Sequence, residues 1–273
     1  MAKLCKVLVV SRSGYYAWEN RPKSARTIEN EVITEQIKVI HNKKRKTYGC
    51  RKMTQELRRI GKLVNHKRVE RIMKQYGIRS KVAKKYKATT NSNHHLPVAE
   101  NILNRQFAAA KPNQKMVSDI TYLWTDEGWL YVAAVMDLCG QKIVGLSMGD
   151  RMTKELVINA LDSVCKRFRP PRGMLIHSDR GSQYCSNDYQ IYLNQHGFVC
   201  SMSRKGNCWD NAPMESFWGK MKYEWLYEQR FLTREQARAA VFEYVEVFYN
   251  RQRLHESNGY LTPEEFYTLA SAA

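Results

Sequence analysis

Three carboxylates occupy positions where they could hold a cation. Asp119 lies inside the apolar, strand-forming run KMVSDITYLWT (115–125), where a charge is costly unless it is paired or binds a cation. Asp179 directly follows the short apolar run MLIHS (174–178), and it is either an ordinary turn residue or a ligand for something positive at a cleft. Glu215 falls in the first turns of a predicted helix. These three residues are therefore the first candidates for chemistry.

The second half of the chain predicts a sheet with helices on its faces. Alternating apolar residues predict three consecutive strands, and shorter apolar runs predict two more. Helical spacing predicts the intervening and following helices. The resulting order, β-β-β-α-β-α-β-α, is typical of an α/β fold with a mixed sheet and flanking helices. The predicted strands are 115–125, 129–139, 142–149, 174–178 and 198–203, and the predicted helices are 153–168, 187–197, 211–225 and 233–253.

The first half predicts short helices over 27–42, 51–60 and 66–76, the last two joined by a tight turn. Gly61 ends one helix and Asn65 can cap the next. This pattern is that of a helix-turn-helix, whose second helix could enter a major groove and contact phosphates. A generic basic helical hairpin is the alternative, because the motif has no strict sequence code. The candidate DNA contacts on its outer face are Lys67, Arg68, Arg71 and Lys74.

Charge divides the chain sharply. The 273 residues carry a net charge of +19. Residues 1–118 contain 28 Lys and Arg against 7 Glu and no Asp, which leaves +21. Residues 119–273 contain 17 Lys and Arg against 19 Asp and Glu, which leaves −2. A basic half of this kind indicates a polyanion partner, either nucleic acid or an anionic membrane surface.

Composition also indicates the cellular compartment of the protein. The longest apolar runs fall far short of the ~20 residues that a bilayer-spanning helix needs, and the N-terminus lacks a signal-peptide pattern. The 7 cysteines are scattered without a C-x-x-C pair, which indicates reduced thiols and argues against zinc. We therefore expect a cytosolic protein with no membrane partner.

Ordered motifs surround the three carboxylates. Fifty-nine residues separate Asp119 from Asp179, and thirty-five separate Asp179 from Glu215. With its motifs, this D-x59-D-x35-E pattern resembles the second-reading-frame transposases of the bacterial insertion-sequence IS-three family. The resemblance covers nearly the whole chain, and Cys50 is a departure where Tyr or Arg is expected. The motifs are SRSGYYAW (11–18), YGCRKMTQELRR (48–59), VNHKRVERIM (64–73), SDITYL (118–123), HSDRGSQY (177–184), SMSRKGNCWDNAPMESFWGKMK (201–222) and YNRQRLHESNGYLTPEEF (249–266).

The resemblance implies a ribonuclease-H-like, integrase-like core and a DDE transposase activity. Asp119, Asp179 and Glu215 would be its catalytic and metal-binding triad. Carboxylate oxygens suit Mg²⁺ or Mn²⁺, and two such ions about 4 Å apart can serve strand cleavage and strand transfer. The expected domains are a basic helical region with the helix-turn-helix over 1–85, a basic linker over 86–112, and a catalytic core with a C-terminal helical extension over 113–273.

The same resemblance implies partners. We expect the chain to bind double-stranded DNA at element ends and at the target, and to form a homo-oligomer on DNA. Relatives usually act as a fusion with an upstream reading frame that carries its own helix-turn-helix and leucine zipper, and such a fusion or association is expected here. The expected location is the bacterial cytosol, associated with the nucleoid.

For several other residues, and for the function itself, the sequence leaves alternative interpretations open. Lys222 lies two helical turns after Glu215, so it is either a DNA contact near the element end or a surface lysine. Arg251, Arg253 and His255 are further DNA-contact candidates, and Trp218 is predicted to be a packing residue. A metal-dependent nuclease on the same fold is the rival enzyme. A non-catalytic DNA-binding regulator is the rival outside enzymes, and a tyrosine recombinase is disfavoured.

Overall fold

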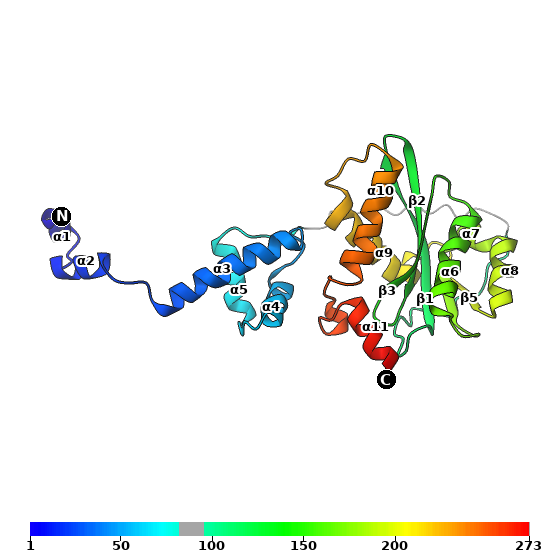
Figure 1. The fold of residues 1–273 in the computed structure, drawn as a ribbon, viewed down its shortest axis with the longest axis horizontal. Helices are drawn as coiled ribbons and strands as arrows, with labels where there is room; N and C mark the ends of the chain where they lie inside the picture. The colour runs from blue at the N-terminus through cyan, green and yellow to red at the C-terminus, as the bar shows by residue number, and fades with distance from the viewer. Residues whose placement is uncertain (82–95, 273) are drawn as a thin grey trace. The chain divides into compact units, whose positions relative to one another are not determined.

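The computed structural model describes residues 1–81 and 96–272 of the chain. The chain divides into two compact units, Met1–Ser80 and Lys81–Ala273, each of which is described by itself (Figure 1). Residues 96–112, which belong to the predicted linker, contain no helix or strand and fall within the second unit, where Leu103 is buried. The remaining linker prediction, residues 86–95, lies outside the described residues.

The described stretches of the chain contain no helix that is both long and apolar enough to cross a membrane.

The first unit is helical. Its core is formed by α3, α4 and α5, whose inward residues Ile37, Leu57 and Val69 are fully buried. The predicted turn signals are confirmed: Gly61 adopts a left-handed φ of 80° after α4, and the Asn65 side chain accepts the Lys67 N–H at the start of α5. The predicted pair of helices is therefore present. The helices of this unit are α1 (Ala2–Val7), α2 (Arg12–Glu19), α3 (Ala25–Lys43), α4 (Cys50–Arg59) and α5 (His66–Gln75).

The second unit is built on a five-stranded mixed sheet in the order β3-β2-β1-β4-β5. The first three strands form an antiparallel meander, while β4 pairs in parallel with both β1 and β5. The predicted mixed sheet is therefore confirmed. Its strands are β1 (Lys115–Thr125), β2 (Gly128–Asp137), β3 (Lys142–Gly149), β4 (Leu175–Ser178) and β5 (Val199–Met202).

Helices cover both faces of this sheet (Figure 1). One face carries α6 (Lys154–Phe168), α7 (Ser182–Cys185) and α8 (Asn187–His196), which enclose the main apolar core with β1, β2 and β3. The other face carries α9 (Ala212–Met221) and α10 (Arg234–Phe242).

Short irregular helices complete the second unit. The predicted long helices each continue into a π-helical turn, because η2 (Lys222–Leu226) follows α9 and η3 (Glu243–Tyr249) follows α10. The 3-10 helices η1 (Cys208–Asn211) and η4 (Glu256–Asn258) and the terminal helix α11 (Pro263–Ala272) were not predicted as separate elements.

Close packing of α6 on the sheet depends on a glycine. A Cβ atom at Gly145 of β3 would lie 2.4 Å from the carbonyl oxygen of Ala160 and 2.6 Å from Cγ2 of Val164. Both neighbours belong to α6, and the carbonyl cannot rotate away because it is backbone. The absent side chain therefore sets the distance between α6 and β3.

We predict that Gly145→Ala lowers the free energy of unfolding of the second unit by about 1–3 kcal/mol, because the added methyl overpacks this contact. Urea unfolding monitored by tryptophan fluorescence measures the stability of this unit, since five of the 6 tryptophans lie in it and the sixth is Trp18. Gly219→Ala is the matched control, because its Cβ would meet nothing within 4 Å in α9 and should be neutral or stabilising. Equal stability of the two variants would contradict the packing account.

Candidate active site

The pairing of β1 with β4 brings two of the predicted carboxylates to one place. Met116 lies opposite Ile176 and Val117 lies opposite His177 in this parallel pair. Continuing the same register two residues further sets Asp119 opposite Asp179, which directly follows β4. The sequence separation of Asp119 and Asp179 therefore corresponds to the residue offset between the parallel strands β1 and β4.

Asp119 is surrounded by like charges and by two hydrogen-bond donors. Its carboxylate accepts the N–H of Ile120 at 2.9 Å and the Nε1–H of Trp218 at 3.1 Å. Burial, followed by the nearby Asp179 carboxylate, raises the pKa of Asp119 well above 3.8, and Glu215 adds to the rise. The two hydrogen bonds oppose the shift without cancelling it. The site therefore favours either a proton or a cation at Asp119.

Helix α9 supplies the third carboxylate. Glu215 lies in its first turn, and Trp218 follows three residues later on the same side of the helix. Since Trp218 donates to Asp119, this arrangement directs the face that carries Glu215 toward β1. The Glu215 side chain is exposed, and partial desolvation raises its pKa.

Asp179 is held by its own turn. Its Oδ1 accepts the backbone N–H of Gly181 at 2.8 Å, as expected for a turn-building aspartate. The same carboxylate acts on the pKa of Asp119. Both interpretations of Asp179, as a turn residue and as a charge facing Asp119, therefore apply at once.

The three carboxylates do not form a closed ligand set. Within residues 1–81 and 96–272, no three His, Cys, Asp or Glu side chains gather closely enough to hold a metal ion. Their assignment as a catalytic and metal-binding triad remains a prediction. Their oxygens are nevertheless the hard donors that Mg²⁺ and Mn²⁺ prefer, and no sulfur or imidazole competes among the three.

Lys222 is not the surface lysine that the sequence left open as the alternative to a DNA contact. It begins the π-helical turn η2, and only 5% of the residue is exposed. Its ammonium lies 5.4 Å from the centre of the Tyr122 ring on β1. Burial lowers the pKa of Lys222 to about 8, and the Asp119 carboxylate partly offsets that shift. A role of Lys222 in DNA binding remains a prediction. The DNA would have to reach the ammonium group at this recessed position.

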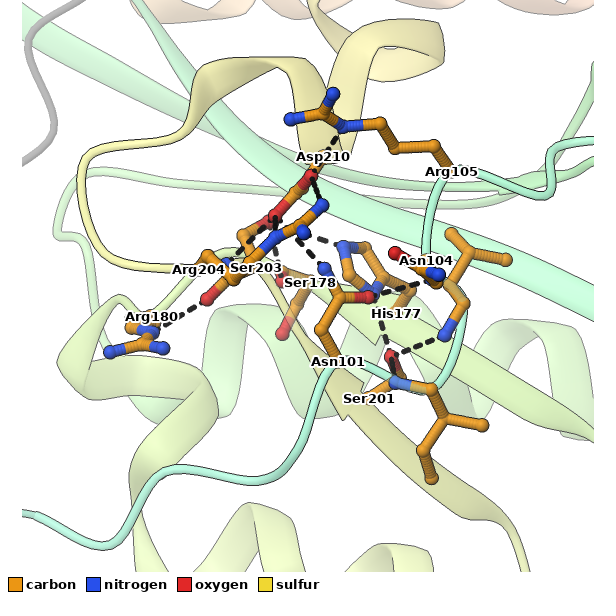
Figure 2. Close-up of polar contacts among 12 residues, drawn as sticks. Asn101, Asn104, Arg105, His177, Ser178, Arg180, Ser201, Ser203, Arg204 and Asp210 are labelled. Atoms are coloured by element: carbon orange, nitrogen blue, oxygen red, sulfur yellow. Dashed lines mark hydrogen bonds and ion pairs between the residues drawn. The ribbon is translucent and has the colours of Figure 1, made fainter.

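A buried aspartate fixes the loop that precedes α9 (Figure 2). The Asp210 carboxylate is fully buried and accepts donors from both sides. Arg204 donates its backbone N–H and Nε–H at 2.9 Å and an Nη2–H at 2.7 Å, Arg105 donates its Nε–H at 2.8 Å, and Asn101 donates at 2.9 Å. The Arg204 side chain is the main reason that the pKa of Asp210 is lowered from its ordinary value.

The same network continues into the sheet at His177 (Figure 2). This residue of β4 is fully buried, and its two ring nitrogens lie 2.8 Å from Ser201 Oγ and 3.1 Å from Ser203 Oγ. Burial lowers the pKa of His177 to about 4, so the ring is neutral at pH 7. The histidine therefore ties β4 to β5 and is not directed into solvent.

A second buried ion pair follows α9. Glu224 of η2 accepts the Nη2–H of Arg253 at 2.6 Å and the hydroxyl of Tyr244 at 3.0 Å. Arg253 and His255 are both buried, at 5% and 3% exposure. The prediction that these two residues contact DNA is therefore wrong for the arrangement seen here. Arg253 is used to neutralise Glu224.

The predicted DNA-contact helix is α5, and three of its four basic residues are free to face a partner. Lys67, Arg71 and Lys74 are exposed and recur at i, i+4 and i+7, which places them on one stripe. Arg68 differs, because it donates to Glu29 Oε2 at 2.8 Å and to Asn30 Oδ1 at 2.9 Å, both on α3. DNA binding by any of the four remains a prediction.

Two residues of the site were missed or misjudged from sequence. Trp218 was predicted to pack, yet its indole N–H donates to Asp119. Asp210, interpreted from the sequence only as structural or exposed, is the buried anchor of the loop before α9, and its position between Arg204 and α9 was a usable signal. Neither role follows from a periodic pattern, because each depends on which distant groups lie opposite.

We predict that Asp210→Asn lowers the free energy of unfolding at pH 7 by about 2–4 kcal/mol, because it leaves Arg105 and Arg204 without their buried counter-charge. A depressed pKa contributes stability above pH 3.8 that is lost as the pH falls further, so the difference between wild type and variant should narrow below pH 4. Urea unfolding at pH 3 to 7 measures both effects.

Asp188→Asn is the control for this experiment. Asp188 forms an exposed ion pair with Lys154, which should contribute less than about 1 kcal/mol. A similar loss of stability in both variants, or a pH-independent difference for Asp210→Asn, would contradict the assigned role.

Comparison with known proteins agrees with the fold and the motifs. The chain matches the family described as "Integrase core domain" over residues 109–208 and again over 196–263, and the family described as "HTH-like domain" over residues 27–86. A chain of the simian T-cell lymphotropic virus intasome aligns with a TM-score of 0.49 and 14% identity over 86% of this chain and 74% of that one, a likeness too weak to support a conclusion.

Sequence relatives are much closer. The "Insertion element IS600 uncharacterized 31 kDa protein" of Shigella sonnei is 49% identical over 96% of this chain and 97% of its own length. The "Transposase InsF for insertion sequence IS3A" of Escherichia coli K12 is 43% identical over 96% of this chain and 92% of its own length. With the integrase core, the helix-turn-helix-like region and the ordered motifs, these matches show that the chain belongs to the IS3 family of insertion-sequence transposases.

Proposed function

We propose that this DDE-type transposase cuts and joins DNA at a site formed by Asp119, Asp179 and Glu215. The observation that carries the assignment is geometric: the β1–β4 register sets Asp179 beside Asp119, and the Trp218–Asp119 hydrogen bond turns the Glu215 side of α9 toward them. A half-buried carboxylate beside two others is unfavourable by itself, and a divalent cation relieves the repulsion. The substrates are the ends of the insertion element and a target duplex.

The donor set fits Mg²⁺ or Mn²⁺, held by oxygens of the three carboxylates. When two such ions are bound, they activate the attacking oxygen and stabilise the leaving oxygen of an in-line phosphoryl displacement. The chain's own residues orient the donors. Ile120 N–H and Trp218 Nε1–H fix one oxygen each of Asp119, and Gly181 N–H fixes Asp179. Glu215 is exposed and is the most adjustable of the three.

The first unit serves as the DNA-holding part. Residues 1–80 contain 21 Lys and Arg against 6 Glu and no Asp, which leaves +15, and this charge and the exposed stripe on α5 support binding to a duplex. We further propose that the chain acts as a homo-oligomer on DNA, fused to or associated with an upstream-frame protein, in the bacterial cytosol near the nucleoid. The domain limits 1–85, 86–112 and 113–273 belong to this proposal.

We predict that Asp119→Asn, Asp179→Asn and Glu215→Gln each reduce cleavage and joining of element-end DNA at least a thousandfold, because each removes a charge that the cations need. Each variant should still fold and bind DNA. Gel analysis of nicked and joined products with Mn²⁺ measures activity, and Asp162→Asn on the surface of α6 should retain it. Near-normal cleavage in any one variant refutes that residue's assignment. Nicked products without joined products in the wild type would favour the rival nuclease.

We predict that Lys67→Gln, Arg71→Gln and Lys74→Gln together weaken duplex binding. The slope of log K against log salt should become shallower by about 0.9 for each phosphate that the triple variant no longer neutralises. Lys38→Gln on α3 is the control, because Lys38 already pairs with Glu35 at 2.7 Å and lies outside the stripe. Fluorescence anisotropy with a labelled duplex at several salt concentrations measures the slope. An unchanged slope in the triple variant would remove α5 from the interface.

A further inference from the structure

A pocket opens beside the proposed catalytic site, and no function assigned so far uses it. It has a volume of about 300 Å³ and is lined by side chains of β1, β2 and the segment after α9. The residues that shape it are Tyr122, Trp124, Trp129, Lys222 and Tyr227. A cavity of this size lies at the low end of the ~300–1,000 Å³ range of small-molecule sites. It is suited to one flat ring system and is too small for a helix.

Aromatic rings form its walls. The Trp129 ring lies edge-on to Tyr122 at a centroid distance of 5.0 Å and to Trp124 at 4.8 Å. These rings are also unusually accessible, with Trp124 at 60%, Trp129 at 42% and Tyr227 at 59% exposure. Large aromatic side chains that cluster and remain exposed mark a binding surface. Such rings offer faces on which a flat partner can stack.

The pocket lies close to the reacting end of the DNA in the proposed function. Tyr122 follows Asp119 by three residues on the same strand, which corresponds to about 10 Å at the rise of a β-strand. Lys222 links the two places, since its ammonium lies over the Tyr122 ring and its charge interacts with Asp119. A partner in this pocket is therefore within one or two nucleotides of the phosphate at the carboxylates.

The chemistry of the lining selects a nucleobase. Stacking of a base on an aromatic side chain contributes about 1–3 kcal/mol and does not depend on which base it is. Lys222 adds one cationic donor at the wall, which complements a base carbonyl or an adjacent phosphate. To enter, the base must leave the duplex stack, as bases do in other enzymes that act on DNA.

We propose that this pocket receives one unstacked base of the DNA strand that is cut, next to the cleaved phosphate. The base stacks on the tryptophan rings, and Lys222 contacts it or its phosphate. This inference rests on the proposed function and adds to it a device for holding the DNA end in place. The pocket would thereby separate the end of one strand from its complement before cutting.

The first experiment locates the base by crosslinking. The probe is a duplex of the chain's own element end, with 5-iodouracil placed at single positions on either side of the cleaved phosphate. The protein is the full-length Asp119→Asn variant, so that binding is observed without cutting. We expect one position to crosslink to peptides containing Trp124, Trp129 or Tyr227. Crosslinks only to other parts of the chain would overturn the proposal.

The second experiment tests stacking in the active protein. Trp124→Ala should lower cleavage about tenfold, because 1.4 kcal/mol corresponds to a factor of ten. On a duplex whose pocket nucleotide is abasic, wild type and variant should cut equally, since there is no base to stack. Phe242→Ala is the control, because Phe242 is 55% exposed on α10 outside the pocket. A tenfold gap that persists on every abasic duplex, or no gap at all, would overturn the proposal.

The outcomes separate this inference from the function on which it rests. If the wild type cuts its element end but no probe position crosslinks to the pocket, the pocket assignment fails and the transposase site stands. If the wild type cuts no DNA, the proposed site fails, and the crosslinking result still decides whether a base occupies the pocket. A change in oligomeric mass of Trp124→Ala without DNA would show a protein interface instead, and would also overturn the proposal.

Discussion

The Asp119 carboxylate is the constraint on which the second unit depends. It is half-buried on a central strand, and two further carboxylates act on it. Each of these conditions disfavours its charge. Among the described residues, the hydrogen bonds from Ile120 and Trp218 and the nearby Lys222 ammonium compensate only in part, so a demand for positive charge remains. In the proposed function, the cations that drive the reaction supply this positive charge. The repulsion between the carboxylates therefore favours metal binding.

Helix α9 has to be held firmly for this arrangement to work, because it carries Glu215 and Trp218. Buried carboxylates that pair with arginines fix the chain on both sides of it, although only the Glu224–Arg253 pair is buried at both partners. Asp210 anchors the preceding loop to Arg105 and Arg204, and Glu224 anchors the following π-helical turn to Arg253. A buried ion pair adds little net stability, but breaking one is costly, which makes such pairs suited to fixing one geometry. The helix is thus positioned by charges that take no part in the chemistry.

Electrostatic roles are divided between the two units. The first carries +15 of the net +19 and presents it on exposed side chains such as Lys67 and Arg71, where it can attract phosphates from a distance. The second carries only +4 over a longer stretch, and several of its charged residues form close ion pairs. Long-range attraction and local positioning therefore rest on different parts of the chain, and the aromatic pocket beside Asp119 supplies a third, short-range kind of contact.

Local patterns in the sequence were sufficient for the strands, most helices, the turn between α4 and α5, and the family, because periodicity, caps and ordered motifs are properties of neighbouring residues. The spacing of Asp119 and Asp179 matches the offset of β1 and β4, a pairing that only the structure shows. The partners of individual charges were decided only by the tertiary structure. Arg68 resembles its neighbours on α5, yet Glu29 and Asn30 engage it, and Lys222 and Arg253 are buried although both were expected to reach DNA. A charged side chain is exposed or paired according to which distant segment lies opposite, and this is determined by packing between elements.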